Sequence, residues 1–171
     1  MTTDTLSAVK KVLKTSKKSS TKTPSNRLMT ALTDWIETYP FDPDPEFVPR
    51  KNSDTIEFNQ TLLQNNLQFY FATSQSDSVL ALMIHIDGNE IPREKQSIVR
   101  DWMTWRNISL NVGSFQMTPD SKNFYYFGSI DFSGVQEIDK QMISNLYNRG
   151  RISVGTYIGE FFNLVGSDSR Y

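Results

Sequence analysis

Residues 67–86 read LQFYFATSQSDSVLALMIHI and predict two adjacent β-strands. Over 67–72, large apolar side chains occupy every second position, which is typical of a strand with one buried face. The polar residues 74–78 supply turn chemistry. Residues 79–86 form a continuous apolar run of strand length, and such a run favours a central strand covered on both faces. We therefore expect an antiparallel hairpin at the centre of a sheet.

Three more strands are predicted around this hairpin. Residues 55–60 alternate between apolar and polar, and the pair Asn65-Asn66 indicates a turn before the next strand. Residues 108–117 and 124–132 alternate in the same way on either side of a polar turn. The alternation slips by one residue across Gly113, which predicts a β-bulge there.

Three amphipathic helices complete the expected fold. The first should run from a cap at Ser25 to Tyr39, before Pro40. The second should span 92–106, with Asn107 as its stop. The last should begin at the capping box Ser133-x-x-Gln136, break near 148–151 around a glycine, and end at Gly166; Gly155 and Gly159 would permit a close approach to a neighbouring element.

The predicted fold is therefore α+β, in the order α-β-β-β-α-β-β-α. It has one antiparallel sheet of about five strands, with helices mainly on one face. A chain of 171 residues fits one domain, which we assign to 25–171. Residues 1–24 are expected to be a basic, Ser/Thr/Lys-rich flexible tail, because the stretch 15–25 has no large apolar side chain to bury.

Composition excludes several classes of function. The chain has no cysteine, which excludes disulfides, thiol catalysis and thiolate metal sites, and its single histidine, His85, weakens any histidine-based catalytic or metal centre. No apolar run reaches the ~20 residues of a membrane span. The carboxylates of Asp42, Asp44 and Glu46 alternate with prolines but lack the glycine and later glutamate of a calcium loop. We expect no cofactor, no metal, no catalytic residue and a cytoplasmic, non-enzymatic protein.

Charge is distributed unevenly along the chain. Residues 1–27 hold seven basic side chains and one acidic one, a net charge of +6, whereas the remainder holds 11 basic and 18 acidic ones, a net charge of −7. Three interpretations of the basic segment stay open: a solvated tail, an electrostatic arm for nucleic acid or another anionic surface, and an organelle transit peptide. The arm would use the lysines of this segment, namely Lys10, Lys11, Lys14, Lys17, Lys18 and Lys22.

Aromatic residues point to a protein interface. In the strand 124–132 they occupy successive positions, so rings point to both faces of the sheet. If helices cover one face only, the rings on the other face meet a partner or lie exposed, unless the first helix folds over them. The candidate interface residues on the sheet and the second helix are Trp102, Met103, Trp105, Tyr125 and Phe127.

The chain also resembles a known family over about 53–166. The pattern (V/I)-P-x-E-K opens the second predicted helix, and the strand that follows reads like L-x-(V/I)-G-x-(F/Y). The matching residues are Ile91-Pro92-Arg93-Glu94-Lys95, Arg106-Asn107, Leu110-Asn111-Val112-Gly113-Ser114-Phe115, Asp120, Tyr125-Tyr126, Ser129-Ile130-Asp131 and Gly134. These motifs and the element order are similar to those of the YbjN family of bacterial proteins. The resemblance implies a type III secretion chaperone-like fold and a dimeric, chaperone-like or regulatory binding role.

Two interpretations of the function therefore stay open. The first is a homodimeric protein-binding module, and the second is a nucleic-acid-associated or structural protein that contacts phosphates through its basic arm. The acidic body disfavours the second, because a surface of net negative charge repels phosphate.

Overall fold

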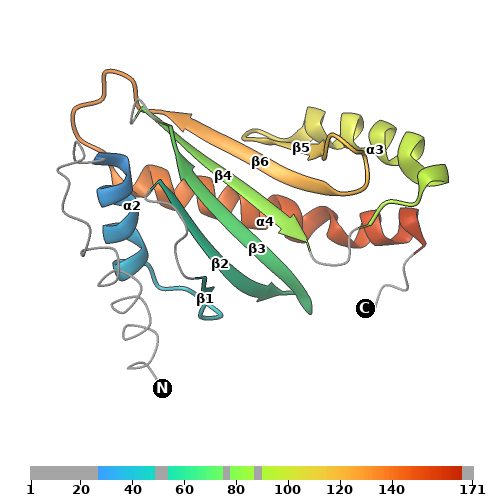
Figure 1. Cartoon of the computed structure of the whole chain (residues 1–171), viewed down its shortest axis with the longest axis horizontal. Coiled ribbons are helices and arrows are strands. Elements are labelled where there is room, and N and C mark those ends of the chain that lie inside the picture. The colour runs from blue at the N-terminus through green and yellow to red at the C-terminus, as the bar shows by residue number, and fades with distance from the viewer. Residues whose placement is uncertain (1–26, 49–53, 75–77, 87–89, 167–171) are drawn as a thin grey trace.

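The computed structural model describes residues 27–48, 54–74, 78–86 and 90–166. These residues form one antiparallel sheet and three α-helices, which confirms the α+β class (Figure 1). The expected tail, its six lysines and the cap at Ser25 lie outside the described residues.

The sheet has six strands in the spatial order β1-β2-β3-β4-β6-β5, and every neighbouring pair is antiparallel. The long strands β2, β3, β4 and β6 form its body, whereas β1 and β5 are short edge strands. The bounds are β1 Glu46–Phe47, β2 Thr55–Leu62, β3 Asn65–Thr73, β4 Val79–Ile86, β5 Ser114–Met117 and β6 Phe124–Asp131.

All three helices pack on the same side of the sheet. They are α2 (Arg27–Thr38), α3 (Gln96–Ser109), which follows the short 3-10 turn η1 (Arg93–Lys95), and α4 (Lys140–Val165). In Figure 1, α4 runs behind the sheet along its length, α2 lies beside one end of α4, and α3 lies beside β5. The core fills the space between this helix layer and the sheet.

An aromatic cluster joins the helix layer to the sheet. The Tyr147 ring on α4 lies 5.5 Å from Trp35 on α2 and 5.4 Å from Phe69 on β3, as centroid distances. Phe58 stacks on Phe69 at 5.0 Å. Each strand contributes alternate side chains to this core, and α2 lies on the inner face with them. The first helix therefore does not cover the second face of the sheet.

The central strand is covered on one face only. On β4, Leu80, Leu82 and Ile84 are buried against the helices, whereas Met83 and His85 between them stay partly exposed. The expectation of a strand covered on both faces is wrong. The run looked uniform because its outward positions hold moderately apolar side chains that do not need full burial.

Several predicted boundaries also need correction. The first turn lies at Leu63-Gln64, both of which have positive φ, and not at Asn65-Asn66. The predicted strand 108–117 shortens to β5, because its first residues extend α3, so Gly113 precedes the strand and forms no bulge. A Cβ at Gly113 would collide with the Tyr126 hydroxyl.

The last helix begins later than predicted and has no break. Asp139, and not Ser133, caps α4 by accepting a hydrogen bond from the Gln141 backbone N–H at 2.8 Å. The helix then continues through 148–151 to Gly166, whose φ of 74° ends it as predicted. Gly150 lies within the helix on the side that faces the sheet, where a Cβ would come within 2.8 Å of Ile84, so the glycine serves a close approach and not a break.

The connector between α2 and β2 is more ordered than predicted. Instead of a plain extended segment, it contributes the two-residue strand β1, in which Glu46 pairs with Asn59 and Phe47 with Phe58. The Phe47 ring packs on Phe58 at 5.3 Å. β1 is therefore the sixth strand of the sheet, beyond the five that the sequence predicted.

Candidate functional site

The side of the sheet away from the helices carries aromatic, histidine, carboxamide and carboxylate side chains close together. We call this surface, formed by the outward-pointing side chains of the six strands, the open face. Strand register places its residues in rows that cross the sheet. One row runs Gln68, His85, Tyr125 on β3, β4 and β6, and the next row contains Tyr70, Met83 and Phe127. All six side chains are half-buried.

His85 is held between two neighbours on the open face. Its ring stacks on Tyr125 with a centroid distance of 5.3 Å and an interplanar angle of 23°. Its Nε2 lies 2.9 Å from the sulfur of Met83. Partial burial lowers the pKa of His85 below its ordinary value, so the ring is neutral at pH 7. These contacts pack His85 between Met83 and Tyr125.

Hydrogen bonds fix the polar half of the same face. Gln68 donates from Nε2 to Glu57 Oε1 at 2.6 Å. The hydrogen bond of Tyr70 with Glu57 raises the pKa of the Tyr70 hydroxyl, with a smaller contribution from burial. On the other side, Tyr125 donates its hydroxyl to Gln116 Oε1 at 3.1 Å. Tyr70 and Tyr125 are therefore held by polar partners on neighbouring strands.

The open face is acidic. Glu46, Glu57 and Asp131 occupy outward positions on β1, β2 and β6. Hydrogen bonds from Ser133 lower the pKa of Asp131, so this carboxylate is ionised at neutral pH. In the described part of the chain, no strand carries a lysine or arginine. The basic residues of this part lie on helices, η1 or turns: Arg27, Arg93, Lys95, Arg100, Arg106, Lys122, Lys140, Arg149 and Arg151.

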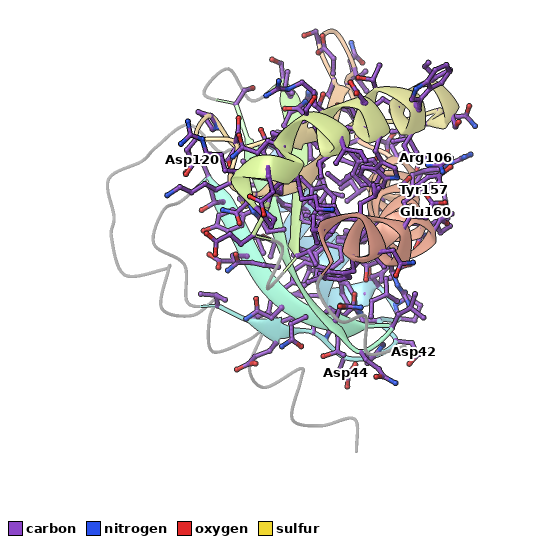
Figure 2. The ribbon with its side chains drawn as sticks, turned by 90° about the vertical axis from the view of Figure 1, so that its right-hand side faces the viewer. Asp42, Asp44, Arg106, Asp120, Tyr157 and Glu160 are labelled. Atoms are coloured by element: carbon purple, nitrogen blue, oxygen red, sulfur yellow. The ribbon has the colours of Figure 1, made fainter. Side chains whose placement is uncertain are left out.

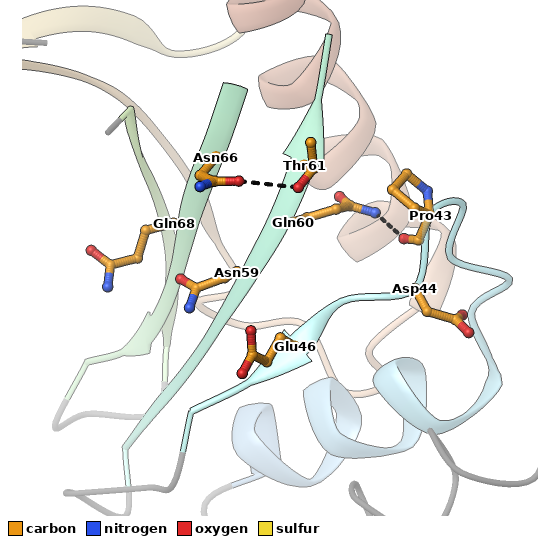
Figure 3. Close-up of a pocket in the computed structure, with 8 residues that line it drawn as sticks. All are labelled: Pro43, Asp44, Glu46, Asn59, Gln60, Thr61, Asn66 and Gln68. Atoms are coloured by element: carbon orange, nitrogen blue, oxygen red, sulfur yellow. Dashed lines mark hydrogen bonds between the residues drawn. The ribbon is translucent and has the colours of Figure 1, made fainter. Parts of the chain in front are cut away.

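A polar pocket of about 430 Å³ opens at the β1–β2–β3 end of the sheet (Figure 3). It is lined mainly by carboxamides and carboxylates: Pro43, Asp44, Glu46, Asn59, Gln60, Thr61, Asn66 and Gln68. Figure 3 shows the carboxylates of Asp44 and Glu46 pointing in different directions, so they do not form a facing pair. Such a lining can exchange hydrogen bonds with a polar or cationic group.

One residue of this pocket is structural. Gln60 is 3% exposed, and its Nε2 donates to the Pro43 carbonyl at 2.5 Å. Its Oε1 accepts from the Tyr147 hydroxyl at 2.5 Å. Gln60 thereby joins the connector, β2 and α4. Gln60 was not among the predicted site residues, although the alternation that buries Ile56 and Phe58 places Gln60 on the same face.

A charged cluster lies in the helix layer, away from the open face. Arg106 Nη2 lies 2.7 Å from Glu160 Oε2, and Trp102 donates from Nε1 to the same oxygen at 3.0 Å. The Arg106 guanidinium also lies 5.2 Å from the centre of the Tyr157 ring. Figure 2 shows Arg106, Tyr157 and Glu160 together, far from Asp42 and Asp44. The cluster ties α3 to α4.

The predicted interface residues are divided among three places. Trp102 and Met103 are 9% and 6% exposed and belong to the core, so they offer no surface to a partner. Trp105 is 71% exposed on the outer side of α3. Tyr125 and Phe127 lie on the open face.

Within the described ranges, no three His, Asp or Glu side chains come together in a group that could hold a metal ion. No helix of the described chain is both long enough and apolar enough to cross a membrane.

No family model matches the chain, and comparisons with curated proteins and with solved structures give no match either.

Proposed function

We propose that this chain is a non-enzymatic protein-binding module that is homodimeric and binds its partner through the open face. The observation that carries this proposal is the one-sided packing of the helices, which leaves Tyr70, Met83, Tyr125 and Phe127 half-buried on the other side of the sheet. Register makes these side chains neighbours across three strands. A contiguous apolar patch with a polar rim is typical of a protein interaction site.

The side chains of the open face favour binding over catalysis. Glu57 accepts a hydrogen bond from Gln68, Tyr125 donates to Gln116, and His85 packs between Met83 and Tyr125. This arrangement orders a surface and sets no nucleophile beside a base. The resemblance to the YbjN family supports a chaperone-like or regulatory role for such a surface, and the lack of cysteine favours a cytoplasmic location.

Self-association is assigned to a second surface. Ile98, Trp105 and Ile108 follow one side of α3 and are 46%, 71% and 73% exposed. We call them the α3 stripe. Exposed Trp and Ile side chains at helical spacing can pack against the same helix of a second copy, with burial of apolar surface as the driving force.

Sedimentation equilibrium across the micromolar range tests the dimer. A mass near twice 19.7 kDa is expected, and Trp105→Asp should shift the equilibrium towards monomer without unfolding the chain. A mass near 19.7 kDa at every concentration would contradict the dimer.

Affinity capture from native lysate tests the binding surface. The double substitution Tyr125→Ser with Phe127→Ser should lose the proteins that the full chain retains. Ile152→Ser is the matched control, because Ile152 is 64% exposed on α4 and lies outside the open face. Equal capture by all three chains would place the binding surface elsewhere.

The alternative function, nucleic-acid binding through the basic arm, makes a different prediction. Such binding should weaken steeply with salt and be lost when the six arm lysines are replaced by glutamine. The open face would not contribute, because its charged groups are carboxylates.

A further inference from the structure

We propose that the basic segment Lys10–Lys22 of this chain binds the open face of the same molecule and masks it. This inference rests on the proposed function for its biological meaning, because a masked face is regulated only if a partner uses it.

Charge complementarity is the first argument. The segment carries six lysines and no acidic residue. The strands carry Glu46, Glu57 and Asp131 on the open face, and within the described residues they have no basic side chain. The three described helices and η1 carry eight basic and five acidic side chains, a net charge of +3, whereas the strands carry a net charge of −3. A lysine-rich segment is therefore attracted more strongly to the sheet side of the molecule than to the helix side.

The attachment point is the second argument. The segment joins the described structure at Arg27, whose Nη1 donates to the carbonyls of Val135 and Gln136 at 2.5 and 3.1 Å. These carbonyls follow the end of β6 closely, and the last residue of β6 is Asp131 on the open face. The segment therefore starts beside one end of the surface that it would cover.

The segment is also long enough. Lys10 lies 17 positions before Arg27. An extended chain spans up to ~3.5 Å per residue, so this length reaches ~60 Å. Six strands spaced ~4.8 Å apart are only ~24 Å across. Because the segment is tethered to the face, its effective concentration there is in the millimolar range, which favours binding within one molecule over binding between copies.

The face offers lysine two kinds of contact. The carboxylates of Glu46 and Glu57 can pair with ammonium groups, and the polar pocket beside Glu46 supplies carboxamide oxygens around it. The rings of Tyr125 and Phe127 can cover the methylene stems of lysine and attract its charge. The neutral His85 between these groups adds no opposing positive charge at pH 7.

A peptide titration tests the masking. The probe is a synthetic peptide with the sequence of residues 8–24, and it is titrated into the full chain and into a full-length variant whose six arm lysines are glutamine. The variant should bind the peptide, and the unsubstituted chain should bind it much more weakly because its own segment competes. A peptide with all lysines replaced by glutamine should bind neither chain. Equal affinity for both chains, or binding to neither, would overturn the proposal.

Matched substitutions locate the peptide site. In the lysine-free variant, Glu46→Gln and Glu57→Gln should each weaken peptide binding by about threefold to fivefold, the upper range for an exposed ion pair. Glu94→Gln and Asp101→Asn, on η1 and α3, should leave the peptide affinity unchanged. If the helix-side substitutions weaken binding as much as the open-face ones, the attraction is nonspecific and the proposal fails.

Zero-length cross-linking of lysine to carboxylate on the full chain shows whether the segment that binds the open face belongs to the same copy of the chain or to a second copy. Cross-links to Glu46 and Glu57 should dominate over those to Glu94 and Asp101 and should disappear at high salt. When chains of two isotopic labels are mixed, these links should join residues of the same copy. Links between copies would overturn masking within one molecule. Partner capture can fail while every result here holds, so failure of the proposed function and failure of this inference are distinguishable.

Discussion

The side chain of Asn107 hydrogen-bonds both backbone groups of Phe115. Asn107 Nδ2 donates to the Phe115 carbonyl at 3.0 Å, and the Phe115 N–H donates to Asn107 Oδ1 at 2.7 Å. Phe115 lies in β5, an edge strand of the sheet. The carboxamide therefore takes the place that a further strand would occupy and satisfies the edge at this residue.

Asn107→Ala should destabilise the fold by about 1–3 kcal/mol, because it leaves two half-buried backbone groups without their partner. Urea unfolding measures the loss. Asn111→Ala is the control, since Asn111 is exposed in the turn before β5 and its loss should cost less than about 0.5 kcal/mol. Equal losses for the two variants would show that the Asn107 bonds contribute nothing. The uncovered edge of β5 should also increase concentration-dependent self-association, which light scattering measures.

Local patterns predicted most of the elements of this fold. Alternation located most of the strands from Ile56 to Phe132, a continuous apolar run located β4, and helical spacing located three helices. Patterns within one element failed where a contact between elements decided the outcome. Asn107 was interpreted as the residue that ends the second helix, yet α3 continues to Ser109. The Asn107 side chain instead hydrogen-bonds Phe115 in β5, eight residues further along the chain. Nothing in its local sequence records that contact.

Only part of the candidate site was predictable from the sequence. The alternation of rings in β6 correctly indicated that Tyr125 and Phe127 point away from Tyr126. The polar rows of the same face, such as Gln68 beside His85, depend on the register between strands. The first turn sets the register of β2 on β3 and was predicted two residues too late, and the pairing of Gln68 with His85 depends on the second turn, for which the sequence predicted no register, so these rows were not predictable.

Two glycines of α4 should respond to alanine in opposite directions. A Cβ at Gly150 would lie 2.8 Å from Ile84 Cδ1 and 2.9 Å from Tyr126 Cε1. Ile84 can move, but the Tyr126 ring is fixed in the core, so Gly150→Ala should cost about 1–3 kcal/mol by overpacking. A Cβ at Gly155 would meet Leu62 at 3.4 Å, an ordinary contact. Gly155→Ala should therefore stabilise by up to about 1 kcal/mol through helix propensity. Denaturant midpoints decide the two signs, and matching signs would contradict the packing given for α4.

The two tryptophans of α3 form a second matched pair. Trp102 packs between Phe115, Phe124 and Phe161 with centroid distances of 5.5–6.1 Å. Trp102→Ala should cost about 3–5 kcal/mol through cavity formation and the loss of its bond to Glu160. Trp105→Ala should change the free energy of unfolding by less than about 0.5 kcal/mol at concentrations where the chain is monomeric. Comparable losses measured by thermal unfolding would mean that Trp105 also belongs to the core.

Two buried tyrosines should make the fold sensitive to alkali. Tyr126 donates its hydroxyl to the Val112 carbonyl at 2.7 Å, and Tyr147 donates to Gln60 at 2.5 Å. Burial is the main cause that raises the pKa of each hydroxyl to about 12. Nearby arginines, Arg149 and Arg151, oppose this shift only in part.

Because a tyrosine in an unfolded chain ionises near pH 10, the unfolded chain releases these two protons at lower pH than the folded one does. The stabilisation is therefore complete below about pH 10 and is lost as the pH rises towards about 12. Urea unfolding across this range should show a steep fall in the free energy of unfolding. Tyr126→Phe and Tyr147→Phe should each lower stability at pH 7, since each removes a hydrogen bond, but should make the alkaline fall shallower. An alkaline fall that keeps its full depth in the double variant would show that other groups cause it.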